Sequence, residues 1–163
     1  MHRKALNIYL NDHLAGATSG VELCRRIART HRSSARAGEL RALAEDIAQD
    51  RQTLLEVMDS LEITPHRYKI YVGWAAEKVA RLKPNGRVLR RSGLSTLIEL
   101  ETLRLGIQGK HHLWRALRHV APESDHFDTS RLQGLMDRAT NQMETVDSLH
   151  DTAARAVLSR GGG

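Results

Sequence analysis

Cysteine, proline and aromatic residues are scarce in this sequence, and each scarcity narrows the fold. Of 163 residues, one is cysteine, three are proline and 4% are aromatic. A lone cysteine, Cys24, excludes an intramolecular disulfide and any metal site built from several cysteines. The prolines fall between apolar-periodic segments rather than inside them, where a helix would tolerate them poorly. These features predict a helical bundle with an aliphatic core.

A long apolar run is also missing. No stretch approaches the roughly 18 apolar residues that a membrane-spanning helix needs. The first residues, MHRKALNIYLNDHL, turn polar too early for a secretory signal peptide. We therefore expect a soluble, cytoplasmic protein with no membrane span.

Four long segments carry apolar residues at the three- and four-residue spacing of a helix that buries one face. They predict helices over 4–29, 35–62, 93–120 and 129–158. In the first helix, the apolar stripe contains Leu10, Leu14, Ala17, Val21, Cys24 and Ala28. In the second, it contains Leu40, Leu43, Ile47, Asp50, Leu54, Val57 and Leu61. Asp50 is the one polar member of that stripe, and it lies in the middle.

The third helix has two stripes. One contains Leu97, Leu100, Leu103, Ile107, Trp114 and Leu117, and the other contains Leu94, Ile98, Glu101, Leu105, Gln108, His112 and Ala116. We expect Glu101, Gln108 and His112 to form a polar layer that fixes helix register. The stripe of the fourth helix contains Leu132, Leu135, Ala139, Gln142, Val146, Leu149 and Ala153.

A shorter helix is predicted over 65–82, between the second and third long helices. Thr64 is a suitable N-cap and Pro65 a suitable first residue, and Lys83-Pro84-Asn85-Gly86 is a strong turn signal. The chain, 1–163, is then expected to form a single all-α domain with a long helical connection in its middle.

This pattern of short, long and short links resembles the ferritin-like antiparallel four-helix bundle, in which a long crossover joins the second helix (B) to the third (C). The segment LNDHLAGA (10–17) is similar to the opening of a ferritin-like first helix. LKPNGR (82–87) and LIELETLRLGIQGKHHLWRAL (97–117) are similar to stretches of an uncharacterised family of small bacterial helical proteins. The resemblance covers nearly the whole chain, and it implies no activity, because a fold alone does not specify one.

Ferritin-like oxidases hold two metal ions, iron or manganese, with a glutamate on each of two helices and Glu-x-x-His on the other two. The residues that fit this resemblance best are Asp50, Glu101, Asp147 and His150. The first helix supplies no ligand, because Ala17 occupies the aligned position and Glu22 lies about 120° from the apolar stripe. Binding of iron or manganese at a degenerate site is therefore the alternative interpretation.

Asp50 needs a partner, since a buried carboxylate is costly unless it is paired or protonated. His150, Arg104 or His112 on facing helices are the candidates, and a structural pairing is favoured over a ligand or catalytic role. Cys24 lies on a buried stripe, which favours an inert core thiol over a nucleophile.

The net charge of +6 is concentrated in one stretch, HRYKIYVGWAAEKVARLKPNGRVLRR (66–91). This stretch contains one acidic residue, Glu77, and eight basic residues: Arg67, Lys69, Lys78, Arg81, Lys83, Arg87, Arg90 and Arg91. A second basic cluster surrounds the link between the first two helices and contains Arg25, Arg26, Arg29, Arg32, Arg36 and Arg41. If the long connection runs back along the bundle, the two clusters meet at one pole.

Walker A, G-x-G-x-x-G, G-x-S-x-G and H-E-x-x-H motifs are all missing from the sequence. We therefore expect a non-catalytic binding or accessory protein that contacts an anionic partner, nucleic acid or an acidic protein surface, through its basic residues. Assembly into a homo-oligomer through an apolar surface near Trp74 is an alternative that the sequence does not separate from this one.

Overall fold

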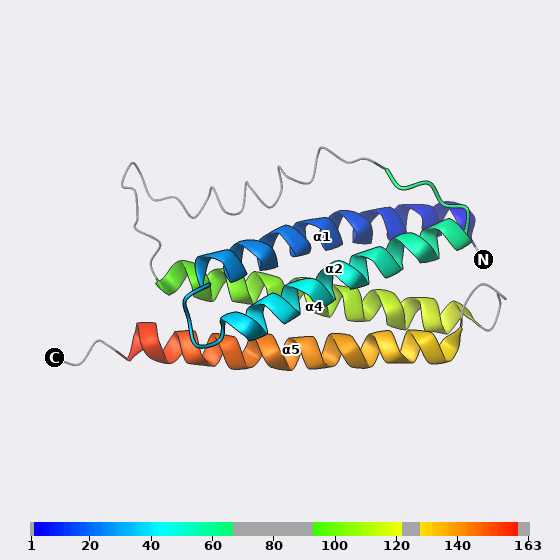
Figure 1. Cartoon of the computed structure of the whole chain (residues 1–163). Coiled ribbons are helices and arrows are strands. Elements are labelled where there is room, and N and C mark those ends of the chain that lie inside the picture. The colour runs from blue at the N-terminus through cyan, green and yellow to red at the C-terminus, as the bar shows by residue number, and fades with distance from the viewer. Residues whose placement is uncertain (1, 67–92, 122–127, 160–163) are drawn as a thin grey trace.

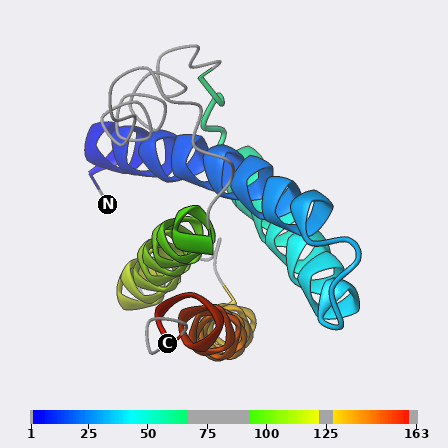
Figure 2. The ribbon, with the colours of Figure 1, turned by 90° about the vertical axis from the view of Figure 1, so that its left-hand side faces the viewer.

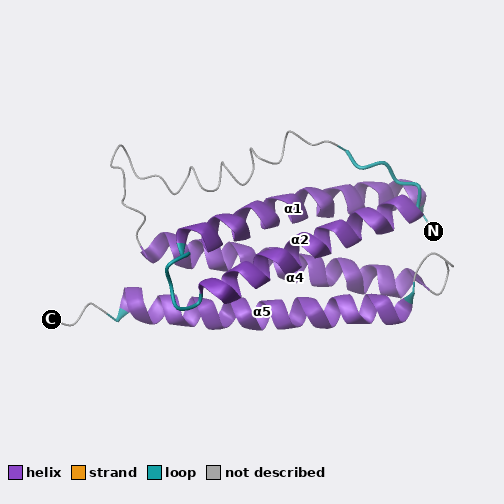
Figure 3. Cartoon of the chain, viewed as in Figure 1, coloured by secondary structure: helices purple, strands orange, loops and turns teal. Residues whose placement is uncertain are grey.

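The computed structural model describes residues 2–66, 93–121 and 128–159, and these residues form four long helices and no strand (Figures 1 and 3). The helices are α1 (Arg3–Thr30), α2 (Ala37–Ser60), α4 (Gly93–Val120) and α5 (Thr129–Leu158). Each begins and ends within two residues of its predicted range. The expectation of an all-α helical bundle is confirmed for this part of the chain.

Across the described ranges, no helix combines the length and the apolar character that a membrane crossing requires.

The helices are arranged as two hairpins. Residue numbers increase in opposite directions along α1 and α2, and likewise along α4 and α5 (Figure 1). Contact is most extensive between α4 and α5, followed by α1 with α2 and then α1 with α4, whereas α2 and α5 touch at few points. Figure 2 shows α5 nearly end-on while α1 and α2 cross the view, so the first hairpin is inclined to α5.

Contacts between the hairpins define the two ends of the bundle. At one end, His31 contacts Thr96 at 3.2 Å, close to where α4 begins. At the other end, Arg131 at the start of α5 pairs with Glu56 near the end of α2 at 2.8 Å. The end of α2 and the start of α4 therefore lie at opposite ends of the bundle. The predicted helix over 65–82 lies almost entirely outside the described residues.

Asn11 fixes the chain where it leaves α2. Its side chain is buried, donates from Nδ2 to the Thr64 carbonyl at 3.3 Å, and accepts at Oδ1 from the His66 amide at 2.6 Å. An asparagine amide offers a donor and an acceptor together, so one side chain can bind both backbone groups. An asparagine in the apolar stretch of α1 thus serves as an anchor, a role that its sequence context did not indicate.

Two aliphatic clusters fill the bundle, one toward each end. The first includes Val21, Cys24, Ile27, Leu40, Leu43, Ile47, Leu100, Leu103, Ile107, Val146 and Leu149. The second includes Leu10, Leu14, Leu54, Met58, Leu113, Trp114, Leu117, Leu132 and Leu135. These residues belong to the predicted stripes or lie beside them, so the spacing of apolar residues in the sequence identified the buried face of each helix correctly.

The second stripe of α4 does not form a buried polar layer, and that prediction is wrong. Leu105 is 72% exposed, and Glu101 and His112 are also exposed. Gln108 contacts His112 at 3.1 Å along the same helix. One helix face can pack on its neighbours only over a limited width, and in α4 that face is the stripe through Leu103 and Ile107.

Candidate anion-binding site

The end of the bundle where α1 turns into α2 carries a cluster of arginines, which we name the basic pole. It comprises the residues of the link cluster: Arg25, Arg26, Arg29, Arg32, Arg36 and Arg41. The site is built from the last two turns of α1, a short turn, and the first residues of α2. The start of α4 lies beside it, where Gly93 is needed because a β-carbon there would collide with Val157 of α5.

Two of these arginines stabilise the pole itself. Arg26 pairs with Glu99 of α4 at 3.1 Å. Arg36 binds both carboxylate oxygens of Glu39 at 2.7 Å and also donates to the Ser148 carbonyl of α5 at 2.9 Å. The hydrogen bond to Glu39 raises the pKa of Arg36. Both side chains are therefore largely committed to holding the helices together.

The other four arginines are available to a partner. They are Arg25, Arg29, Arg32 and Arg41, and each is exposed. Each also lacks an ion pair with any residue in the described part of the chain. Guanidinium groups stay charged at any physiological pH and offer five donors each. The basic pole thus presents four positive charges that form no close ion pair in the described part of the chain, and one carboxylate, Glu45, lies among them in the second hollow.

These arginines surround two adjoining hollows of about 480 Å³ each. The first is lined by Arg26, Arg29, Thr30, Arg32 and Ser33. The second is lined by Arg25, Ala28, Arg29, Arg41, Ala44, Glu45 and Ala48. Arg29 belongs to both hollows, so they form one continuous basic surface around the end of α1.

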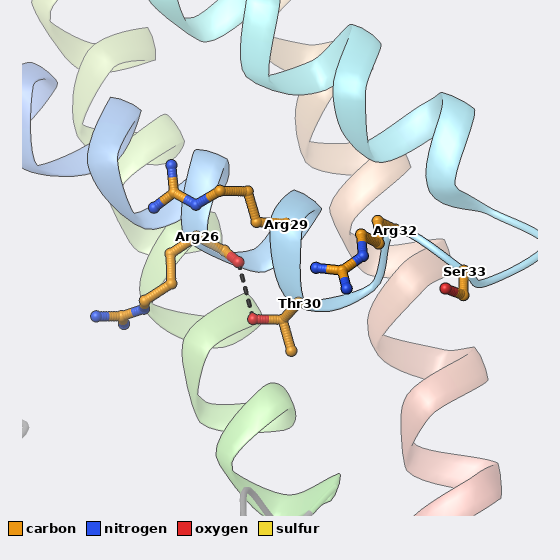
Figure 4. Close-up of a pocket in the computed structure, with 5 residues that line it drawn as sticks. All are labelled: Arg26, Arg29, Thr30, Arg32 and Ser33. Carbon is orange, nitrogen blue, oxygen red and sulfur yellow. Dashed lines mark hydrogen bonds between the residues drawn. The ribbon is translucent and has the colours of Figure 1, made fainter.

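Figure 4 shows the side chains that line the first hollow. The guanidinium groups of Arg26, Arg29 and Arg32 are spread over it and do not converge on one point. The Thr30 hydroxyl donates to the Arg26 carbonyl at 2.9 Å (Figure 4). The first hollow is thus lined by three guanidinium groups and two hydroxyl groups, with no carboxylate among the lining residues.

The predicted basic residues of the long connection lie outside the described residues. These are Arg67, Lys69, Lys78, Arg81, Lys83, Arg87, Arg90 and Arg91. Arg90 and Arg91 come two or three positions before Gly93, the first residue of α4. Trp74, near which an oligomer interface was expected, is also outside.

A second cluster of charged groups lies inside the bundle, around Asp50. This carboxylate is only 2% exposed and forms ion pairs with Lys110 of α4 and Arg138 of α5. The Gln142 amide donates to it at 2.9 Å, and Lys110 also donates to the Gln142 carbonyl oxygen. The cluster separates the two aliphatic cores, because Asp50 lies between Ile47 and Leu54 along α2.

Burial and charge shift the pKa values of Lys110 in this cluster and of Cys24 in the aliphatic core next to it. Burial lowers the pKa of Lys110, and the attraction of Asp50 opposes that change. Burial also raises the pKa of the Cys24 thiol to about 11, with a smaller opposing effect from Lys110. Cys24 is fully buried in the aliphatic core, as the sequence predicted. Its high pKa makes the thiolate rare near neutral pH, so it is a poor nucleophile there.

The predicted pairing of Asp50 is confirmed, but its predicted partners are wrong. Arg104 pairs instead with Asp147 at 3.0 Å, and His150 with Glu101 at 3.1 Å. The sequence contained a signal for Lys110. In the buried stripe of α4, Ile107 and Trp114 are seven residues apart, and the regular three- and four-residue spacing places position 110 between them on the same face. A lysine at that position faces inward. Arg138 flanks the stripe of α5 and gave no comparable signal.

The four candidate metal ligands do not meet at one place. Glu101 and His150 lie together, whereas Asp147 is bound to Arg104, and Asp50 lies in the interior cluster. In the described ranges, no group of three or more His, Cys, Asp or Glu residues could hold a metal ion. The donor set that the ferritin-like resemblance implies therefore does not fit the arrangement of these residues.

Comparison of the chain with protein-family models, with curated proteins and with solved structures gives no match.

Proposed function

We propose that this protein is a non-catalytic helical bundle that binds an anionic partner at the basic pole. The observation that carries the proposal is the set of four exposed arginines around two adjoining hollows, none of them paired with an acid in the described part of the chain. Clustered unpaired cations raise the local positive potential and accelerate encounters with anions. Arg26 and Arg36 hold the surface in place through contacts to α4 and α5.

The long connection extends the proposal. Its eight basic residues include Arg90 and Arg91, which immediately precede the helix that begins beside the basic pole. Helix α2 ends at the opposite end of the bundle from the pole, whereas α4, which follows Arg90 and Arg91 in the sequence, begins beside it. We propose that these residues add to the same anion-binding surface.

The topology that we propose for the whole chain is ferritin-like. Two helical hairpins joined by a segment whose ends lie at opposite ends of the bundle support this arrangement. The proposed function does not follow from that topology, because one fold serves many functions.

Chromatography on immobilised heparin tests the proposal. The variant R29Q/R32Q removes two exposed arginines of the pole, and R115Q/R118Q removes two exposed arginines at the same spacing from the opposite end of α4. We expect the wild type and R115Q/R118Q to be retained and to elute at similar salt, and R29Q/R32Q to elute at clearly lower salt. Equal elution of the two variants, or no retention of the wild type at low salt, would contradict the proposal.

A further inference from the structure

We infer that the partner of the basic pole is the phosphate backbone of double-stranded nucleic acid, bound without reading the bases. This inference rests on the proposed function and narrows its partner to one chemical class. Three features of the pole support it: the spread of its cations, the density of charge that a partner must match, and the residue types that line the hollows.

The cations are arranged for an extended anion. A site for one small phosphate needs donors that converge on a point, whereas the guanidinium groups in Figure 4 are spread out. Arg29 joins the two hollows, so the charged surface continues from one to the other. Along α1, Arg25 and Arg29 are about 6 Å apart at 1.5 Å per residue. Duplex DNA carries one negative charge per roughly 1.7 Å of its axis, so it can neutralise all of these arginines together.

The density of charge favours a phosphate backbone over an acidic protein surface. Three arginines and the Ser33 hydroxyl line the first hollow, and no carboxylate is among its lining residues. Arginine and serine are among the side chains that contact phosphate and sugar oxygens in nucleic-acid complexes. An acidic protein surface would bring fewer charges, interspersed with cations that Arg29 and Arg32 would repel. It would also release fewer condensed counterions on binding.

The lining residues also argue against single strands and against base recognition. None of the residues that line the two hollows is aromatic, whereas proteins that hold single strands stack bases on aromatic rings. The hollows are lined by the end of α1, the turn after it and the first turns of α2, and not by one exposed helix face of the kind that enters a DNA groove. Contacts to the backbone alone predict affinity that depends on salt and not on sequence.

Fluorescence anisotropy with three probes tests the inference: a short duplex, one of its single strands, and polyglutamate of matched charge. Titrations between about 50 and 200 mM salt give the dependence of affinity on salt. We expect the duplex to bind most tightly, and a duplex of scrambled sequence to bind equally well. R29Q/R32Q should reduce the slope of log affinity against log salt by about 2, or one for each arginine. R115Q/R118Q should leave that slope unchanged.

Two kinds of failure can be told apart. If the single strand or polyglutamate binds as tightly as the duplex, or if scrambling the duplex weakens binding, the duplex-backbone inference is wrong, and an anion-binding pole survives provided that R29Q/R32Q still weakens the binding. If no probe binds at low salt, or if R29Q/R32Q binds like the wild type, the proposed function fails as well.

Discussion

Asp50 is a buried carboxylate of α2 that binds side chains of both α4 and α5. One carboxylate faces two cations, Lys110 and Arg138, in a layer between two aliphatic cores. Pairing a buried charge offsets the cost of removing it from water, but it seldom adds much net stability. The pairing does disfavour other helix registers, since each would leave at least one of these charges unpaired.

Replacing Asp50 with alanine should destabilise the protein strongly. We expect Asp50→Ala to lower the free energy of unfolding in urea by about 3–5 kcal/mol, because it leaves two partly buried cations without their anion. The control Asp46→Ala, at an exposed site one turn earlier on α2, should change it by less than about 0.5 kcal/mol.

An apolar replacement of the whole ion cluster separates charge from packing. The variant D50L/K110M/R138M removes all three charges together, and we expect it to recover most of the stability lost in Asp50→Ala. A triple variant that is less stable than Asp50→Ala, or an Asp50→Ala variant as stable as the wild type, would show that the ion cluster has no such role.

Cys24 makes stability depend on pH in the alkaline range. Burial raises its pKa from an ordinary 9.0 to about 11, so the folded protein keeps a proton that the unfolded chain releases. The stabilising contribution is complete below pH 9 and is lost as the pH rises from 9 to about 11. The loss amounts to about 2–3 kcal/mol, at 1.36 kcal/mol for each pKa unit.

Comparison with Cys24→Ala isolates this effect. Lys110 acts in the opposite direction, since a lowered lysine pKa makes the folded state gain stability as the pH rises, and it is present in both proteins. We expect urea unfolding of the wild type to weaken more between pH 9 and 11 than that of Cys24→Ala. Parallel pH profiles would rule out a raised thiol pKa in the folded state.

At the scale of the element, α2 ends in a Schellman motif with an unusual residue. The Ile63 amide donates to the Met58 carbonyl at 2.8 Å, the Glu62 amide to the Asp59 carbonyl at 2.9 Å, and Ile63 and Met58 are buried. Glu62 has a φ of 52°, the left-handed conformation that this position requires and that glycine adopts most readily. The Arg3–Glu62 ion pair is largely exposed and contributes little.

Glycine at position 62 should therefore stabilise the protein. We expect Glu62→Gly to increase the free energy of unfolding by about 0.5–1 kcal/mol, because it removes the steric cost of a side chain at positive φ. Asp59→Gly, three residues earlier within the helix, should instead reduce it by about 0.5–1 kcal/mol. Thermal unfolding of both variants checks the pair, and a lower melting temperature for Glu62→Gly would contradict this account of the helix end.

The sequence predicted the helices well because their apolar stripes are long and regular. The stripe through Leu40, Leu43 and Ile47 is buried along α2, and the ends of all four helices fall within two residues of prediction. The sequence did not distinguish the two stripes of α4, since both contain leucines, and only packing against other helices decides which one is buried. The partners of Asp50 failed for a related reason: the rotation of α4 decides whether Lys110 or His112 faces inward.

At the scale of the whole molecule, the sequence predicted a basic pole but not the division of labour within it. Composition identifies Arg25, Arg26, Arg29 and Arg32 equally. In the structure Arg26 is bound to Glu99, whereas the other three arginines are exposed. Which arginine is paired depends on which acidic residues the neighbouring helices place beside it. Long-range contacts of this kind cannot be read from a single sequence. The availability of particular arginines is therefore the part of the site that needed the structure.

The most direct test of the basic pole is an NMR titration with a heparin oligosaccharide, a polyanion without bases. Changes in the chemical shifts of the protein's backbone amides report where an anion binds, whatever the natural partner is. We expect them to cluster at residues 25–41 and at the start of α4, and to disappear at high salt. Changes centred on the opposite end of the bundle, around Arg115 and Arg118, would show that the pole is not the binding surface.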